Sequence, residues 1–141
     1  GDGKMQFIMV SHGNLAEAML GSAEMIVGKQ ERVKAFGLEP TEDVSTLRAK
    51  IQARLDEIGS TEEVICFTDL FSGSPFNTVV SLMGTYDIRH ITGMNLPMLL
   101  EAFMMRSNPN NGREAICEKL IKEAPSTFID VNKHLTKETN D

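Results

Sequence analysis

Positive charge and long apolar runs are both scarce in this sequence. Its 14 lysines and arginines stand against 20 aspartates and glutamates, for a net charge of −6, and an acidic chain is a poor ligand for nucleic acids or anionic membranes. No apolar run approaches the roughly 20 residues that a membrane-spanning helix needs, and the first residues have no signal-peptide core. We therefore expect a cytoplasmic protein without a nucleic-acid partner.

Cysteine and the common glycine motifs are also sparse. The two cysteines, Cys66 and Cys117, lack CxxC spacing and fall in an apolar run and a helical pattern, so we predict free structural thiols and no metal site. Neither a GxGxxG nor a GxxxxGK signature is present, which argues against a nucleotide-binding loop. We expect no cofactor.

What the sequence does contain is a regular alternation of strand and helix patterns. A chain of 141 residues suits one domain. Strands are predicted at 6–11, 32–38, 63–68 and 88–92, and helices at 14–27, 44–58, 74–83, 97–105 and 113–123. This order predicts an α/β fold: a doubly wound, mainly parallel open sheet of four strands with helices on both faces.

The two ends of the chain have separate interpretations. Residues 1–4 are interpreted as an expression-tag remnant, residues 5–132 as the domain, and residues 133–141 as a polar tail. Residues 127–131 have the pattern of a last strand.

A histidine and an aspartate follow two of the predicted strands. His12 comes directly after the first strand and Asp69 directly after the third. Ligands of open α/β sheets bind beyond the carboxyl ends of the strands, so the two side chains meet if these strands are neighbours. A carboxylate bound to one imidazole nitrogen fixes the tautomer and leaves the other nitrogen free to attack. The pair predicts a nucleophile for phosphorus.

Two predicted helices begin beside this pair. Gly13 removes a Cβ next to the imidazole, and Asn14 with Glu17 has the spacing of a capping box. Ser74 is the expected N-cap of the third helix, with a proline as its first residue. Free N–H groups at two helix starts bind phosphoryl oxygens without a metal. Asp69 as a loop cap, and Ser74 as an N-cap only, are the plainer alternatives.

Other conspicuous side chains have structural interpretations. His90 lies in a strand pattern and His134 in the tail, so both are expected to be structural or solvated. Asn95 opens a helix at a strand end and either lines the pocket or only starts that helix. A group of methionines is expected in the core or in a dimer interface rather than in a ligand site: Met94, Met98, Met104 and Met105.

Three segments carry a family resemblance. VSHGNLAEAML (10–20), CFTDLFSGSPFN (66–77) and ITGMNLPMLLEAF (91–103) resemble the enzyme IIA (EIIA) domain of the mannose-fructose-sorbose class of the bacterial phosphoenolpyruvate-dependent sugar phosphotransferase system (PTS). The likeness spans roughly residues 5–131. It implies a phosphoryl carrier that takes phosphate from the phosphocarrier HPr and passes it to a IIB component, which phosphorylates sugar entering through the membrane components IIC and IID.

The resemblance also implies roles for single residues. His12 would be phosphorylated, on Nε2, with Asp69 as its carboxylate partner. Phosphate would be bound around the two helix starts, by Gly13, Ser72, Gly73 and Ser74. Phe71 stands where some relatives have tryptophan, and Ser72 where they have glycine, so the docking surface differs in shape. The family further implies a homodimer in which residues 127–131 cross as an antiparallel edge strand into the partner's sheet, and peripheral association with the membrane transporter.

Three other functions remain open at this point. A hydrolase would use Ser74, His12 and Asp69 as a triad, but the GxSxG elbow is absent. A regulatory module would use phosphorylation of His12 only to change a binding surface. The phosphoryl donor domain of dihydroxyacetone kinase has a similar fold, and the GMNLPMLLE segment favours the sugar transporter class over it.

Overall fold

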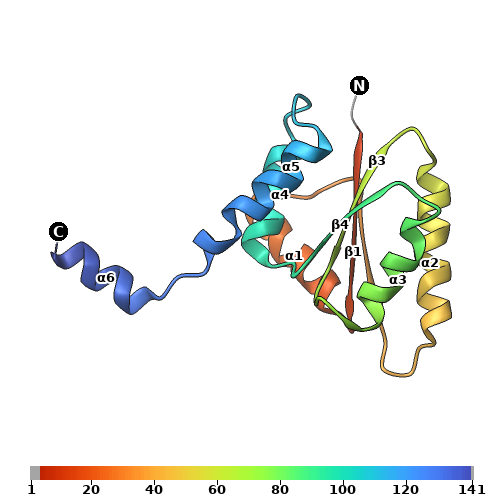
Figure 1. The fold of residues 1–141 in the computed structure, drawn as a ribbon, viewed down its shortest axis with the longest axis horizontal. Coiled ribbons are helices and arrows are strands. Elements are labelled where there is room, and N and C mark those ends of the chain that lie inside the picture. Colours follow the sequence, from red (N-terminus) through yellow and green to blue (C-terminus); the bar gives the residue numbers. More distant parts are fainter. Residues whose placement is uncertain (1–3, 141) are drawn as a thin grey trace.

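The protein folds around a parallel four-stranded sheet, seen in a computed structural model that describes residues 4–140 (Figure 1). The strands are β1 (Met5–His12), β2 (Val33–Leu38), β3 (Glu63–Thr68) and β4 (Ile88–Thr92), in the order β2-β1-β3-β4. The predicted fold class and the four strand positions are confirmed. Apart from the exposed Lys4, the proposed tag remnant lies outside the described residues.

The two central strands are the most continuously apolar ones. Every residue of β1 before His12 is buried, and so is every residue of β3 after Glu63. Each of these strands has a parallel neighbour on both sides and helices over both faces, so side chains on both faces leave water. That is why their sequences show runs of apolar residues rather than alternation.

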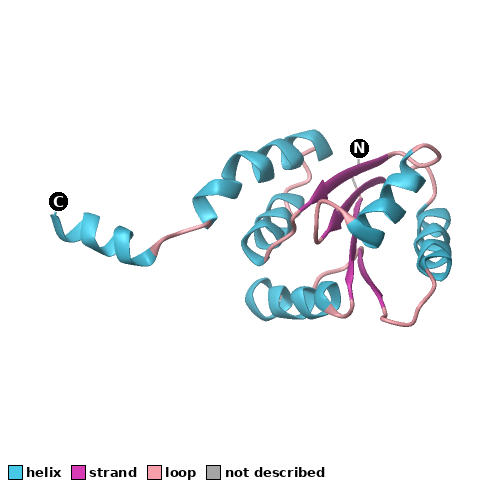
Figure 2. Cartoon of the chain, turned by 60° about the horizontal axis from the view of Figure 1, so that its bottom comes forward, coloured by secondary structure: helices cyan, strands magenta, loops and turns pink. Residues whose placement is uncertain are grey.

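Helices cover both faces of the sheet (Figures 1 and 2). One layer contains α1 (Leu15–Val27), α4 (Leu96–Arg106) and α5 (Arg113–Glu123), and the other contains α2 (Val44–Ile58) and α3 (Gly73–Met83). Each layer has its own core. Phe7, Phe67 and Leu99 are buried on the first side, and Ile8, Leu47 and Leu82 on the second.

The strand order locates the position where a ligand site is expected. From β1 the chain first moves outward to β2 and then returns past β1 to β3 and β4. The reversal falls between β1 and β3, which pair in register from Met5 with Glu63 to Val10 with Thr68. Crossovers leave this switch point in opposite directions, and a crevice opens there at the carboxyl ends of the strands.

The predicted strand at residues 127–131 is wrong for the structure of this chain. Ala124–Thr127 forms a 3-10 turn, η1, in which the hydroxyls of Ser126 and Thr127 donate to the carbonyls of Glu123 and Ala124, at 2.7 and 2.8 Å. A strand exists only where its N–H and C=O groups meet a sheet edge. Residues 128–130 instead leave from the helix layer and run away from the sheet (Figure 1).

Much of the predicted polar tail is helical. Residues Val131–Asn140 form a helix, α6, which extends from the body of the protein (Figure 2). Val131 and Leu135 are spaced four residues apart, so both fall on one side of that helix. We call residues 128–135 the C-terminal arm; its apolar side chains are exposed by 95% (Phe128), 59% (Ile129), 58% (Val131) and 56% (Leu135).

The sulfur-containing side chains are mostly in the core. Both cysteines are buried free thiols, as predicted. Met94 and Met98 are buried and Met105 packs against the same core, whereas Met104 is 60% exposed. The expectation of core packing therefore holds for three of the four methionines.

Candidate active site

His12 and Asp69 meet at the switch point, as predicted. The Oδ2 atom of Asp69 lies 2.8 Å from His12 Nδ1 and accepts a second hydrogen bond, of 2.9 Å, from the His12 backbone N–H. The His12 side chain is 52% exposed and that of Asp69 only 9%. An ionised carboxylate can only accept, so the neutral ring carries its proton on Nδ1 and presents the lone pair of Nε2.

The first residue of α3 lies against the free edge of this ring. Gly73 has φ +86°, and a Cβ at that position would be 3.3 Å from both Cε1 and Nε2 of His12. Glycine suits this site because it tolerates the left-handed backbone and leaves room beside the imidazole. The N-terminus of α3, whose first N–H groups have no partner within the helix, therefore borders Nε2.

The start of α3 differs in detail from the prediction. The helix begins at Gly73 with Ser72 as its N-cap residue, and Ser72 makes no side-chain cap bond. Ser74, the expected N-cap, is instead the second helical residue, and its carbonyl accepts a 2.6 Å bond from the Thr78 hydroxyl. The glycine adopts the turn conformation, so the helix starts one residue earlier than the Ser-Pro signal indicates.

The predicted capping box at the start of α1 is wrong. Asn14 is the N-cap residue but makes no side-chain cap bond. Ser11, which is fully buried, accepts a 2.8 Å bond from the Ala16 N–H and donates to the Gly13 carbonyl at 3.4 Å. The turn at Gly13, with φ +53°, folds the chain back and places Ser11 beneath the helix. Sequence reasoning missed this residue because it lies outside the usual N-cap position.

Gly37 of β2 is a second residue that sequence reasoning missed, and it lies against the same turn. The Gly13 N–H donates a 2.8 Å bond to the Leu38 carbonyl, and Gly37 passes so close that a Cβ there would be 1.8 Å from Gly13 O. A glycine inside a strand pattern often marks such a close backbone approach. That signal was available in the sequence.

The loops around the pair carry apolar groups and no basic residue. Leu15, Leu70 and Phe71 are 45%, 55% and 76% exposed. Residues 12–14, 39–43, 69–72 and 93–95, which follow the four strands, include neither lysine nor arginine. Helix N-termini and backbone N–H groups are therefore the positive elements that these loops offer an anion. Asn95 caps α4 by accepting a 3.0 Å bond from the Met98 N–H, which gives it a structural role.

The two other histidines lie on β4 and α6 rather than in the loops that carry this pair. His90 is half-buried on β4 and hydrogen-bonds to Thr68, and His134 is exposed on α6. Between residues 4 and 140, no three His, Cys, Asp or Glu side chains gather closely enough to hold a metal ion. In the same part of the chain, no helix has both the length and the apolar character to cross a bilayer.

The fold and the site define an open α/β protein with a carboxylate-oriented histidine at its switch point. A family model described as "PTS system fructose IIA component" (EIIA-man) matches residues 6–120. The chain belongs to this mannose-type EIIA family. The relatives reported below are named as EIIA components of sugar PTSs.

Relatives of known sequence agree with this assignment. The chain is 33% identical to the sorbose-specific EIIA component of Lacticaseibacillus casei over 128 residues, 89% of this chain and 91% of that one. It is 36% identical over 104 residues to the mannose-specific EIIAB component of Escherichia coli K12, 72% of this chain but 32% of that protein. The chain thus spans about a third of the length of the E. coli relative.

Solved structures share the fold. The EIIA component from Streptococcus agalactiae superposes with a TM-score of 0.82 at 29% identity, covering 92% of this chain and 98% of that one. The mannose/sorbose-specific IIA subunit from Enterococcus faecalis gives a TM-score of 0.75 at 31% identity, covering 89% and 93%.

Proposed function

We propose that this chain is a phosphoryl-carrier subunit of a sugar PTS. His12 accepts the phosphoryl group from phospho-HPr and passes it to a IIB component for coupled sugar uptake and phosphorylation. One observation carries the proposal: Asp69 holds Nδ1 at 2.8 Å while Nε2 faces the N-terminus of α3. We expect the protein to act in the cytoplasm, beside the membrane components IIC and IID.

The transfer step follows from the geometry of the pair. The Nε2 lone pair attacks phosphorus in line, the bond to the donor's leaving atom breaks, and that atom keeps the electron pair. The ring becomes positively charged, and the adjacent Asp69 carboxylate stabilises this charge without taking the proton. Transfer to a IIB histidine is the same displacement in reverse, with the His12 imidazole as the leaving group.

Four residues are proposed to bind the phosphoryl oxygens. Gly73 and Ser74 supply the first N–H groups of α3, Ser72 and Ser74 supply hydroxyls, and Gly13 leaves space on the other side of the ring. A phosphoryl group on Nε2 would stand at a helix N-terminus, where the free N–H groups and the helix dipole favour negative charge. Such positioning and charge stabilisation provide most of what phosphoryl transfer needs.

Intact-mass analysis tests the acceptor. After incubation with phosphoenolpyruvate, enzyme I and HPr, the wild-type chain is expected to gain one acid-labile phosphate, and His12→Ala is expected to gain none. His134→Ala is the matched control, because it removes an exposed histidine on α6. Full phosphorylation of His12→Ala would place the acceptor elsewhere and overturn the proposal.

Onward transfer separates the carrier from the two alternatives that share its acceptor. A carrier passes its phosphate to a matching IIB protein, whereas a regulatory phosphohistidine module keeps it. A donor domain for dihydroxyacetone kinase would instead support phosphorylation of dihydroxyacetone. A hydrolase would turn over chromogenic esters, whereas a carrier would not. The bond between His12 Nδ1 and Asp69 is common to both functions, so the ester assay is the test that separates them.

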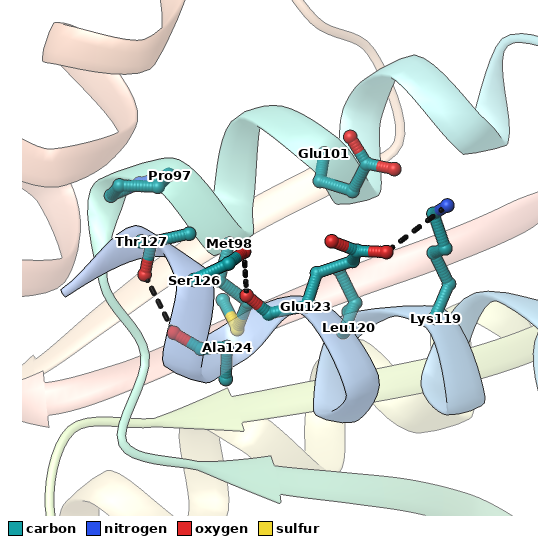
Figure 3. A pocket seen from close by; sticks show the side chains of 9 residues that line it. All are labelled: Pro97, Met98, Glu101, Lys119, Leu120, Glu123, Ala124, Ser126 and Thr127. Atoms are coloured by element: carbon teal, nitrogen blue, oxygen red, sulfur yellow. Dashed lines mark hydrogen bonds and ion pairs between the residues drawn. The ribbon is translucent and has the colours of Figure 1, made fainter. Parts of the chain in front are cut away.

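We also propose that two copies associate through the C-terminal arm. The arm exposes Phe128 by 95%, and an isolated apolar segment is stabilised by burial against a partner. A cavity of about 290 Å³ opens between α4 and α5, with Met98 and Leu120 at its base and Glu101 and Glu123 at its rim (Figure 3). Glu123 is paired with Lys119 at the same rim, at 3.4 Å, so Glu101 is the carboxylate that Lys133 or Lys137 of a second copy would complement.

The oligomeric state tests this association. The wild-type chain is expected to sediment as a dimer, and the double variant Phe128→Ser, Ile129→Ser as a monomer. Met25→Ser is the control, since Met25 is 87% exposed but lies on α1. A wild-type monomer at all concentrations would rule the association out. Exchange of residues 127–131 into the partner's sheet, which the family resemblance implies, stays a prediction.

A further inference from the structure

His90 belongs to a hydrogen-bond chain that ends beside Asp69. Its Nε2 atom lies 2.8 Å from the Thr68 hydroxyl oxygen, and that hydroxyl donates to Thr92 Oγ1 at 2.8 Å. Thr68 is fully buried, and His90 is half-buried. The mechanism proposed for His12 makes no use of this second imidazole.

The donors of this chain can be assigned from proton counts. Thr68 has one hydroxyl proton, which it gives to Thr92, so it can only accept from His90. His90 Nε2 is therefore the protonated nitrogen. Burial lowers the pKa of His90 below its ordinary value, which favours the neutral ring, whose Nε2–H is this single donor. The Thr92 hydroxyl in turn donates a hydrogen bond to the Thr68 carbonyl, at 3.5 Å.

This hydrogen-bond chain holds Thr68, the residue that immediately precedes Asp69, in position. Besides its side-chain bonds, Thr68 accepts a 3.1 Å bond on its carbonyl from the Met94 N–H. Thr68 is the last residue of β3 and pairs in register with Val10 of β1 and Thr92 of β4. Both its side chain and its main chain are thus tied to β4 at the point where the backbone leaves the sheet to present the Asp69 carboxylate.

The same imidazole also contacts the helix that borders His12. The ring of Phe76, on α3, lies 5.2 Å from the His90 ring at an interplanar angle of 39°, and Phe71 packs edge-on against Phe76 at 5.2 Å. Phe71 is in the loop between Asp69 and α3. His90 therefore supports both ends of that loop, through Thr68 on one side and through Phe76 on the other.

We propose that His90 is a positioning residue for phosphoryl transfer: its Nε2–H bond to Thr68, together with its contact to Phe76, holds the Asp69 carboxylate and the start of α3 in place around His12. This inference rests on the proposed carrier function. Misplacement of catalytic groups by about 1 Å can slow a reaction by roughly a hundredfold, so a support one step away has a measurable effect on rate.

A pair of substitutions tests the donor. His90→Phe keeps an aromatic ring against Phe76 but removes the N–H, whereas His90→Gln keeps an N–H donor at similar reach. We expect single-turnover transfer from phospho-HPr to slow about tenfold in His90→Phe and to recover in large part in His90→Gln. The His12 Nδ1–H resonance, a signal of its bond to Asp69, is expected to shift in His90→Phe only. Tyr86→Phe, which removes a hydroxyl that donates to Asp56, serves as the control for loss of one side-chain donor.

The outcomes separate this inference from the carrier function. If the wild-type chain accepts phosphate and folded His90→Phe transfers at the wild-type rate with an unchanged His12 resonance, His90 has no positioning role. If the wild-type chain is not phosphorylated, the carrier proposal fails, and the resonance alone decides on His90. Should His90→Phe not fold, Thr68→Val breaks the same chain with a side chain of similar shape, and the same two measurements apply.

Discussion

Gly37 and Gly13 approach each other so closely that the end of β2 and the turn behind His12 act as one backbone unit. A Cβ at Gly37 would lie 1.8 Å from the Gly13 carbonyl oxygen, a distance that no rotamer change can relieve because both groups are backbone. The position of the His12 ring therefore depends on a residue that is remote in sequence and carries no chemistry.

Gly37→Ala is expected to push this turn away from β2. We predict a loss of about 2 kcal/mol in the free energy of unfolding, typical of overpacking, and slower phosphorylation of His12. Gly21→Ala is the matched control, since nothing lies within 4 Å of a Cβ there, and in the interior of α1 alanine stabilises by roughly 0.5–1 kcal/mol. Urea unfolding and single-turnover phosphorylation measure both effects. A wild-type phosphorylation rate in Gly37→Ala would show that the turn adapts.

Asp69→Asn keeps the size of the side chain but removes its charge. The amide no longer favours the Nδ1–H tautomer or the positive ring formed during transfer, so phosphorylation of His12 is expected to slow by roughly a hundredfold or more. Rapid-quench measurement of transfer from phospho-HPr gives the rate. Asp56→Asn, at an exposed carboxylate that bonds to Tyr86, is expected to transfer normally. A change of less than threefold in Asp69→Asn would contradict the assigned role.

Arg106 joins the end of α4 to the start of the sheet. Its guanidinium donates to the carbonyls of Met5, Glu31 and Arg32 at 3.1, 2.6 and 2.8 Å, and it lies 4.4 Å from the centre of the Phe7 ring. Burial lowers its pKa to about 10, so it stays charged at neutral pH.

Removal of this guanidinium takes a donor from the part-buried carbonyl of Met5 and from the exposed carbonyls of Glu31 and Arg32. Arg106→Met is expected to cost about 3 kcal/mol of unfolding free energy, and Lys122→Met, on the exposed side of α5, less than about 0.5 kcal/mol. Equal effects in denaturant titrations of the two variants would mean that the bonds of Arg106 contribute nothing specific.

The thiols provide a test of the core. Burial raises the pKa of Cys66 to about 12 and raises that of Cys117 as well, so at pH 8 both remain protonated and out of reach of reagents. We expect no modification by a thiol reagent in the native protein and two modified cysteines in denaturant. Rapid modification of Cys66 without unfolding would contradict its position in β3.

His90 makes stability depend on pH. Burial lowers its pKa in the folded protein, so the unfolded chain binds more protons as the pH falls below about 6.5. The stability that the neutral ring of His90 contributes is fully present above the pKa of His90 in the unfolded chain. It is lost as the pH falls toward the lower pKa of His90 in the folded protein. Between pH 7.5 and 5.5 the unfolding free energy of wild type should therefore fall more steeply than that of His90→Gln. Parallel curves would show that His90 does not contribute.

Much of this structure follows from local sequence patterns. β3 and β4 have the predicted bounds because apolar runs between turn residues specify buried strands, and α2 ends at Gly59 as its periodicity indicates. The proximity of His12 and Asp69 follows from topology alone: once the strands are parallel neighbours, residues just beyond their ends converge.

The missed features depend on contacts through space. Ser11 bonds to a helix N–H five residues away only because Gly13 reverses the chain, and no local pattern specifies that geometry. Residues 127–131 have the pattern of a strand but do not form one. A strand also needs an edge to pair with, and that information is not in the segment itself.

The lack of lysine and arginine in the loops around His12 has an energetic consequence. A salt bridge to the bound phosphate would lower the free energy of the loaded protein, and each 1.4 kcal/mol gained there would make release to the next component ten times less favourable. Holding the anion by amide dipoles and serine hydroxyls, without a cation, would bring the free energies of the loaded and empty forms closer together. The phosphoryl group could then be transferred in either direction, and the concentrations of its donor and acceptor would set that direction.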